Sequence, residues 1–282
     1  MKWRGRQQSG NVEDRRRLGG RTMLAGGGAG VLVIAALVWL MGGDPSQVVD
    51  TLQSTSGEYT TVDSSVVEAE QELAEFAGVV LKDTEDIWHA LFSQSGNTYR
   101  EPRLVLFSGS VESACGYSSS ATGPFYCPTD ERVYIDLSFL ADLQQKLGAT
   151  GDFAMAYIIA HEVGHHVQKQ LGIMDQVHGI RGSVSEAEYN AKLVRLELQA
   201  DFLAGIWAHY AQKTKDILEE CDVDEAVNAA AAVGDDRIQM KSQGYVVPDA
   251  FTHGTSDQRR SWFLRGFRTG DLDQGDTFAS DD

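Results

Sequence analysis

Two long helical patterns of hydrophobic residues dominate the second half of the chain. The first begins with an apolar run at residues 153–160 and continues through Val163 and Val167, and no proline interrupts it before Gly172. Asp152 stands where the N-cap of such a helix is expected. The pattern predicts a largely buried helix that carries a few polar side chains among apolar ones.

A second helix is predicted downstream, where a capping-box pair precedes an apolar stripe. Ser185 and Glu188 are the pair, since a hydroxyl residue followed three positions later by Glu is typical of a helix start. The stripe repeats at helical spacing and consists of Leu193, Leu196, Ala200, Leu203 and Trp207. We therefore expect this helix to pack into the core.

Three further helices are predicted from spacing and capping. Helical spacing covers residues 66–92 and 225–240, and Gly234 interrupts the second of these patterns. A last helix is expected after Thr255 or Ser256, because either hydroxyl can cap it. The chain outside its N-terminal part is thus predicted to be mainly helical.

Two short runs, at residues 103–107 and 132–136, are apolar and rich in β-prone side chains. They predict two strands of a small sheet. Residues 66–270 are numerous enough to bury one sizeable core. The expected fold class is therefore α+β, with a single mainly helical domain over residues 66–270.

Residues 22–41 form an apolar stretch without a charged side chain. Twenty helical residues extend about 30 Å, which matches the hydrocarbon core of a bilayer, so we predict a single transmembrane helix. A cleaved signal peptide is the alternative. The length of the run, and its end at Trp39-Leu40-Met41 without a small-residue cleavage site, favour an uncleaved anchor.

The segments around this stretch predict the topology. Residues 1–21 carry seven basic and two acidic side chains, so we expect a cytoplasmic tail, with the domain outside the cytoplasm. Residues 42–65 are polar and rich in Gly, Ser and Thr, which predicts a linker. Residues 271–282 are acidic, which predicts a disordered tail.

The chain has a formal net charge of −17, and its basic residues are concentrated in the N-terminal part. The remainder is therefore strongly acidic, which argues against binding to nucleic acid or to anionic lipid head groups. An acidic domain could favour basic peptide substrates. Solubility through self-repulsion is the simpler interpretation.

The candidate chemistry lies at the centre of the first helix, in the sequence His161-Glu162-Val163-Gly164-His165. Residues four apart share one face of a helix, so His161 and His165 can direct two imidazoles at one zinc ion. Glu162 projects about 100° away and is placed to act as a general base. Burying these polar groups without a partner would cost several kcal/mol, which favours a metal over an ordinary helix face.

The second helix offers the third ligand that a catalytic zinc needs. Glu197 and Asp201 are four residues apart and border the apolar stripe. We expect Glu197 to bind the metal and Asp201 to accept the free N–H of a liganding histidine. An acidic pair on a solvated face is the alternative interpretation.

These two motifs resemble the gluzincin pattern of thermolysin-type and CAAX-prenyl-protease-type peptidases. The chain is most similar to the bacterial neutral zinc metallopeptidases, a family of membrane-anchored proteins. The similarity is carried by residues 123–128, 133–137, 161–168, 197–205, 228–236 and 253–266. It implies a zincin-like fold with one zinc ion.

The resemblance implies roles for two further parts of the chain. In gluzincins the strand before the metal helix lies at the sheet edge, so Gly123, Phe125 and Tyr126 would pair with an extended substrate. His253 occupies the place of a histidine-containing turn and would donate to the oxyanion of the tetrahedral intermediate. A loop or capping role is the alternative for His253. Arg259 is expected to pair with a carboxylate behind the metal.

The three cysteines suit a domain outside the cytoplasm. Cys115 and Cys127 flank a loop-rich stretch, and a disulfide between them would contribute about 3 kcal/mol. No further Cys or His near them has ligand spacing, which argues against a metal role. Cys221 is left as an unpaired thiol.

Together these features predict a membrane-anchored zinc endopeptidase that hydrolyses peptide or protein substrates. Its expected location is the cell membrane, as a single-pass protein with a cytoplasmic N-terminus. An anchored interaction or scaffold protein with a structural or inactive zinc site is the alternative, and a non-peptide amide substrate would need the same residues. An open fourth metal position would favour catalysis, since structural zinc sites are closed.

Overall fold

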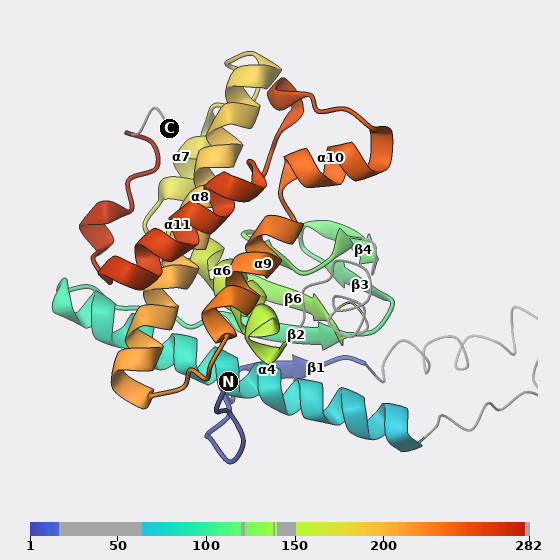
Figure 1. Cartoon of the computed structure of the whole chain (residues 1–282), viewed down its shortest axis with the longest axis vertical. Helices are drawn as coiled ribbons and strands as arrows, with labels where there is room; N and C mark the ends of the chain where they lie inside the picture. Colours follow the sequence, from blue (N-terminus) through green and yellow to red (C-terminus); the bar gives the residue numbers. More distant parts are fainter. Residues whose placement is uncertain (17–63, 120–121, 138, 140–150, 280–282) are drawn as a thin grey trace, which may run out of the picture.

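The computed structural model describes residues 1–16, 64–119, 122–137, 139 and 151–279. The described chain is mainly helical and contains a small sheet, as the hydrophobic pattern predicts. In Figure 1 the long helices α6, α8 and α11 gather beside the sheet, and α4 runs along its lower side.

The two predicted central helices are present. Helix α6 spans Asp152–Gln170 and helix α8 spans Glu186–Lys215. The capping box at the start of α8 is formed, since the Ser185 side chain accepts from the Glu188 amide and the Glu188 side chain accepts from the Ser185 amide. A Cβ at Gly164 of α6 would lie 3.1 Å from the backbone oxygen of Ala200, so the two helices are close at the metal motif.

The start of α6 differs from the prediction, because Asp152 is its first residue and does not cap it. Gly151 holds the cap position at a φ of 102°, and the Glu225 carboxylate accepts from the Phe153 amide at 3.0 Å. Glu225 belongs to helix α9, Asp222–Ala232. A carboxylate from another helix thus satisfies one of the free N–H groups at the start of α6.

Helix α11, Ser256–Thr269, packs along α8 at unusually short range. Of the two candidate caps, Thr255 is the residue used. A Cβ on Gly205 would lie 2.1 Å from the backbone oxygen of Phe263, and a Cβ on Gly266 would lie 2.1 Å from that of Phe202. The two backbones therefore touch where these glycines meet.

The sheet has the strand order β1-β2-β6-β5. The predicted strands are β2, Arg103–Phe107, and β6, Arg132–Asp136, which pair in parallel. Strand β5, Phe125–Cys127, is antiparallel to β6 and lies at the edge, as expected for the segment assigned to substrate. Cys115 and Cys127 form the expected disulfide, and Cys221 is free and exposed.

The other elements connect or flank this framework. The long N-terminal helix and two shorter ones are α4, Ser64–Gln94, α7, Ile173–Gly179, and α10, Asp235–Gln243. A separate hairpin consists of β3, Ser110–Ser113, and β4, Gly116–Ser119. Two 3-10 turns occur at Pro248–Ala250 and Leu272–Gln274.

The N-terminal residues do not form the separate basic tail predicted for residues 1–21. Residues 12–14 form strand β1, Val12–Asp14, which pairs in parallel with β2. Met1 is buried in the main core, and its ammonium pairs with Asp152 and Asp222. The basic composition thus belongs to a segment that is folded onto the domain over residues 1–16.

The C-terminal residues up to 279 also differ from the predicted disordered tail at residues 271–282. Thr277 is fully buried, and its hydroxyl donates to the backbone oxygen of Arg195 at 2.7 Å. Phe278 packs against the main core. These contacts hold the acidic segment against α8, despite its composition.

The predicted membrane span at residues 22–41 lies outside the described residues, as does the predicted linker at 42–65 up to residue 63. Helix α4 begins at Ser64 and takes in the last two linker positions. Among the helices that the structure describes, none combines the length and the apolar character of a membrane span.

Candidate metal centre

Helix α6 presents His161 and His165 one turn apart, with ring centroids separated by 4.8 Å. Glu197 reaches the same place from α8. Its two carboxylate oxygens lie 3.2 Å from His161 Nε2 and 3.3 Å from His165 Nε2. The three predicted metal ligands therefore meet, although His161 and Glu197 are separated by 36 positions in the chain.

This spacing fits a zinc ion. A tetrahedral site with ligand bonds of 2.0–2.2 Å has ligand atoms separated by roughly 3.3–3.6 Å. The two observed distances, each to a different oxygen of Glu197, lie at or just below the short end of this range. Two imidazoles and one carboxylate form a donor set that zinc accepts, and three protein ligands leave a fourth position open. The residues present thus fit the metal that their pattern predicts.

The ring nitrogen of His161 that faces away from this cluster is held by charged groups. Its Nδ1 lies 2.8 Å from the Asp201 carboxylate, as the spacing of Glu197 and Asp201 predicts. Asp201 is fully buried and also accepts from Arg259 Nε at 2.8 Å and from the Tyr157 hydroxyl. Arg259 therefore pairs with the carboxylate behind the metal site, as expected.

The corresponding nitrogen of His165 is held by neutral amides instead. Its Nδ1 lies 2.9 Å from the Gln168 side-chain oxygen. The Gln168 amide nitrogen donates to the Leu196 carbonyl and to the Gln199 side chain, at 2.7 and 3.0 Å. Gln199 in turn donates to the Gly275 carbonyl at 3.1 Å, so the chain of bonds ends in the C-terminal segment.

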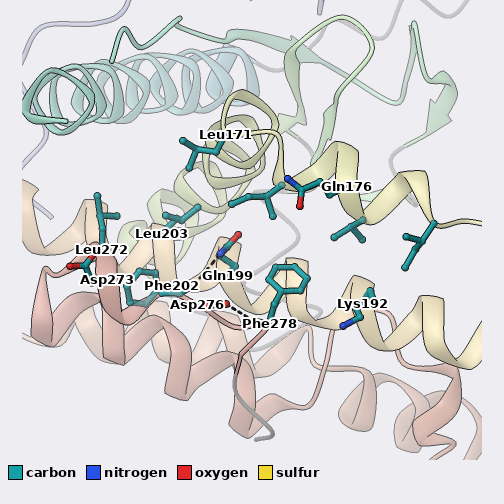
Figure 2. Close-up of a pocket in the computed structure, with 14 residues that line it drawn as sticks. Leu171, Gln176, Lys192, Gln199, Phe202, Leu203, Leu272, Asp273, Asp276 and Phe278 are labelled. Atoms are coloured by element: carbon teal, nitrogen blue, oxygen red, sulfur yellow. Dashed lines mark hydrogen bonds between the residues drawn. The ribbon is translucent and has the colours of Figure 1, made fainter. Parts of the chain in front are cut away.

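Figure 2 shows Gln199, Phe202 and Leu203 of α8 together with Leu272, Asp273, Asp276 and Phe278 of the C-terminal segment. They line a pocket of about 760 Å³ between α7, α8 and that segment. The amide support of His165 thus reaches from the metal cluster to the wall of a separate cavity.

The charges of the cluster set its protonation in the absence of metal. Burial lowers the pKa of His161, but the carboxylates of Asp201 and Glu197 outweigh it and raise this pKa from 6.5 to about 10. Burial raises the pKa of Glu197, yet the two histidines hold it well below its usual range. For Asp201 burial is likewise outweighed, here by Arg259 and His161, and its pKa is lowered.

The cluster opens into a pocket of about 600 Å³. Glu162, the predicted general base, lines this pocket and is 8% exposed. The predicted substrate-contact residues Gly123, Phe125 and Tyr126 line it as well. The remaining walls are largely apolar.

Tyr126 and Phe125 have structural contacts besides their place in the pocket. The Tyr126 hydroxyl bonds His166 Nδ1 at 3.0 Å, and the other ring nitrogen of His166 bonds the Arg100 carbonyl at 2.7 Å. Phe125 stacks on Tyr134 with ring centroids 4.8 Å apart. His166 therefore faces away from the metal cluster.

His253 lines the same pocket and is held by Asp235. Its Nδ1 lies 3.2 Å from one oxygen of that carboxylate. The other oxygen accepts from the backbone amides of Thr252, His253 and Gly254 at 2.7, 2.6 and 3.1 Å. The bond to Asp235 raises the pKa of His253 above 6.5, against the effect of burial.

Sequence reasoning missed four residues that support this site, namely Tyr157, Gln168, Gln199 and Asp235. Tyr157 and Gln168 lie four residues before His161 and three after His165, so helical spacing alone places them on the metal face. For Gln199 and Asp235 no such signal exists, because their partners come from distant parts of the chain.

With the geometry established, comparison with known proteins gives the family. The family model described as "Putative neutral zinc metallopeptidase" matches residues 1–278. This chain belongs to the neutral zinc metallopeptidase family. It is 48% identical over 288 residues to the uncharacterized protein YpfJ of Escherichia coli (strain K12), covering 99% of each chain.

A second relative is similar over about two thirds of its length. The uncharacterized protein Rv2575 of Mycobacterium tuberculosis (strain ATCC 25618 / H37Rv) is 43% identical over 195 residues, which cover 65% of this chain and 64% of that protein. No solved structure matches the chain. Family membership supports a zinc-dependent hydrolase in general terms and gives no substrate.

Proposed function

We propose that this protein is a zinc-dependent endopeptidase whose metal is held by His161, His165 and Glu197. The observation that carries the proposal is the meeting of these three side chains, each with a ligand atom within 4.8 Å of those of the other two. The cluster opens into a pocket that can admit a substrate. An enclosed cluster would instead suit the structural zinc of a scaffold protein.

Zinc, when bound, supplies a Lewis acid that polarises the scissile carbonyl and makes water a better nucleophile. Glu162 accepts a proton from the attacking water on its carboxylate and then delivers it to the leaving amide nitrogen. His253, whose pKa is raised by its bond to Asp235, donates a hydrogen bond to the developing oxyanion. Asp201 fixes the His161 tautomer that leaves Nε2 free for the metal.

The edge strand provides the means to hold a peptide. Strand β5 is hydrogen-bonded on one side to β6 and lies at the edge of the sheet. A substrate can add to this edge as a further strand, with its main chain bonded to β5 and its side chains in the apolar pocket. Backbone pairing of this kind favours extended polypeptides over small amides.

The proposed setting is the outer side of the cell membrane, with residues 22–41 as the attachment. The Cys115–Cys127 disulfide supports it, because such bonds persist in oxidising compartments. The acidic composition supports binding to peptides rather than to nucleic acid.

The test uses the full-length protein purified in detergent. Metal analysis is expected to find about one zinc per chain, and a proteome-derived peptide mixture is expected to be cleaved. Glu162→Gln should retain zinc and lose about 10²–10⁴-fold in turnover, because the general base is removed while the ligands stay.

Two controls complete the test. His161→Ala should lose both zinc and cleavage, while Glu186→Gln, at an exposed position on α8, should change neither. Undiminished cleavage by the Glu162→Gln protein would rule out the general-base role. A protein without zinc would remove the proposal altogether.

A further inference from the structure

Residues 1–16 are bound to the domain by contacts along their whole length. Strand β1 extends the sheet beside β2, and the Leu104 amide donates to the Asn11 carbonyl at 3.0 Å. The Ser9 amide donates to the Gly78 carbonyl of α4 at 2.9 Å. The Trp3 ring packs edge-on against Phe76, with centroids 5.5 Å apart. Residues 1–16 are therefore an integral part of the folded domain.

Two buried carboxylates of α4 accept hydrogen bonds from this segment. Asp83 and Glu85 are each 2% exposed. Asp83 accepts from Arg6 at 2.6 Å, and Glu85 accepts from Asn11 at 2.9 Å and from the Ser9 hydroxyl. Lys215 also donates to Asp83, at 2.8 Å, and Lys82 lies 3.4 Å from the Glu85 carboxylate. Residues 1–16 supply the remaining partners, and a buried carboxylate that loses a partner is destabilised, so this segment stabilises α4.

The segments that flank the apolar stretch at residues 22–41 are in direct contact with each other. The Arg16 guanidinium donates to the Glu70 carbonyl of α4 at 2.9 Å and lies 3.7 Å from the Glu70 carboxylate. In Figure 1 the end of β1 and the start of α4 lie on the same side of the molecule. The described chain thus stops at Arg16 and resumes at Ser64 on that side of the domain.

A single membrane crossing is incompatible with these contacts. One crossing by residues 22–41 would place Arg16 and Glu70 on opposite sides of a hydrocarbon core about 30 Å thick. Residues 42–63 cannot provide a second crossing, because they are polar and contain Asp44, Asp50, Glu58 and Asp63.

We propose that residues 1–16 lie on the same side of the membrane as the catalytic domain, so that residues 22–41 do not separate them by a single crossing. The inference rests on the contacts of residues 1–16 and on the proposed membrane attachment by residues 22–41, and it is independent of the proposed peptidase activity. It reverses the positive-inside prediction for the N-terminus, because Arg6 and Arg16 are engaged by carboxylates and carbonyls of the domain.

The test labels single cysteines with a membrane-impermeant maleimide in intact cells that express the full-length chain. Cys221 is first replaced by Ser, and the disulfide is left in place. Gln7→Cys reports on the N-terminal segment and Ser93→Cys on α4, since both positions are exposed. We expect the two cysteines to react to the same extent, before and after permeabilisation.

Each pattern of labelling has one meaning. Reaction of Ser93→Cys in intact cells together with reaction of Gln7→Cys only after permeabilisation would overturn the proposal. Equal protection of both cysteines in intact cells would support their location on the same side of the membrane. It would contradict the proposed location of the domain outside the cytoplasm. The zinc content of the protein is unaffected by any of these outcomes.

Hydrogen exchange on the purified full-length protein tests the contact itself. The amides of Ser9 and Arg15 donate to Gly78 and Leu106 carbonyls at 2.9 and 2.8 Å. They are expected to exchange at least about 100-fold more slowly than unstructured amides. Exchange of both at the unstructured rate would overturn the docking of residues 1–16 and the shared side with it.

Discussion

The two histidines of the metal centre are chemically alike but are supported in different ways. His161 is backed by a buried carboxylate, Asp201, which is itself paired with Arg259. His165 is backed by the amide of Gln168, which carries no charge. One support is therefore ionic and buried deep in the core, while the other is neutral and leads outward to the C-terminal segment.

The difference indicates which support sets the affinity for the metal and which mainly sets the orientation of the ring. A carboxylate on Nδ1 makes the imidazole more basic and strengthens its bond to zinc, whereas an amide mainly orients the ring. We therefore expect substitutions behind His161 to affect metal affinity and stability together. Those behind His165 should affect mostly geometry.

The largest effect is expected from Asp201→Asn. It leaves the Arg259 guanidinium buried without a counter-charge and should lower the free energy of unfolding by about 3–5 kcal/mol. Zinc affinity, corrected for the proton that His161 releases on binding, should fall by about 10–100-fold, because the carboxylate behind His161 is lost. Thermal unfolding and competitive zinc titration measure the two effects. An Asp201→Asn protein with wild-type zinc affinity would contradict the ionic support of His161.

The pH dependence follows from the raised pKa of His161, about 10 without metal. Zinc requires the neutral ring, so binding at neutral pH releases a proton, and affinity should rise about tenfold per pH unit from pH 6.5 towards 8.5. The stability of the metal-free protein changes in the opposite direction with pH. Its stabilisation by protonated His161 is complete below pH 6.5 and is lost as pH rises towards 10.

Zinc titrations and thermal unfolding at several pH values measure these opposite trends. Asp201→Asn should flatten the pH dependence, because it removes a carboxylate that raises the His161 pKa. Gln168→Ala should leave the slope unchanged. If both substitutions changed the slope of zinc affinity against pH by the same amount, the two supports would not differ in charge.

A smaller effect is expected from Gln168→Ala. His165 loses its acceptor and the Leu196 carbonyl loses a donor, but no charge is left unpaired. Zinc affinity should fall by up to about tenfold and the free energy of unfolding by about 1–2 kcal/mol. Competitive titration against Asp201→Asn gives the comparison directly. A loss as large as that of Asp201→Asn would remove the distinction between the two supports.

The smallest effect is expected from Gln199→Ala, which breaks the bond to the Gly275 carbonyl and leaves Gln168 on the Leu196 carbonyl. Zinc affinity should change by no more than about threefold, and the free energy of unfolding should fall by about 1 kcal/mol. Faster hydrogen exchange in residues 272–279 is the specific readout. Unchanged exchange there would show that Gln199 does not hold the C-terminal segment.

Local spacing predicted most of the site. His161, His165 and Asp201 follow from the four-residue repeat of a helix, and the apolar neighbours of Glu197 indicated that it faces the core. The same argument would have found Gln168, which lies less than one turn after His165. A rule based on spacing within one helix therefore accounts for both helices that carry the ligands.

Composition failed at both ends of the chain. Residues 1–16 are basic and residues 271–279 are acidic, which is typical of exposed tails, yet both segments are docked. Their partners are distant in sequence, as Arg6 with Asp83 and Thr277 with Arg195 show. Strand β1 has three residues, too few for its periodicity to be recognised. Contacts between distant segments cannot be predicted from local composition.

The glycines where α8 and α11 touch lie four residues after Asp201 and seven residues after Arg259. A methyl group at either glycine would overlap the opposite main chain, so the helices would have to separate. That separation would pull the guanidinium away from its carboxylate, since each is carried by one of the two helices. Gly205 and Gly266 thus determine how firmly Asp201 and Arg259 hold His161, although neither glycine contacts that histidine.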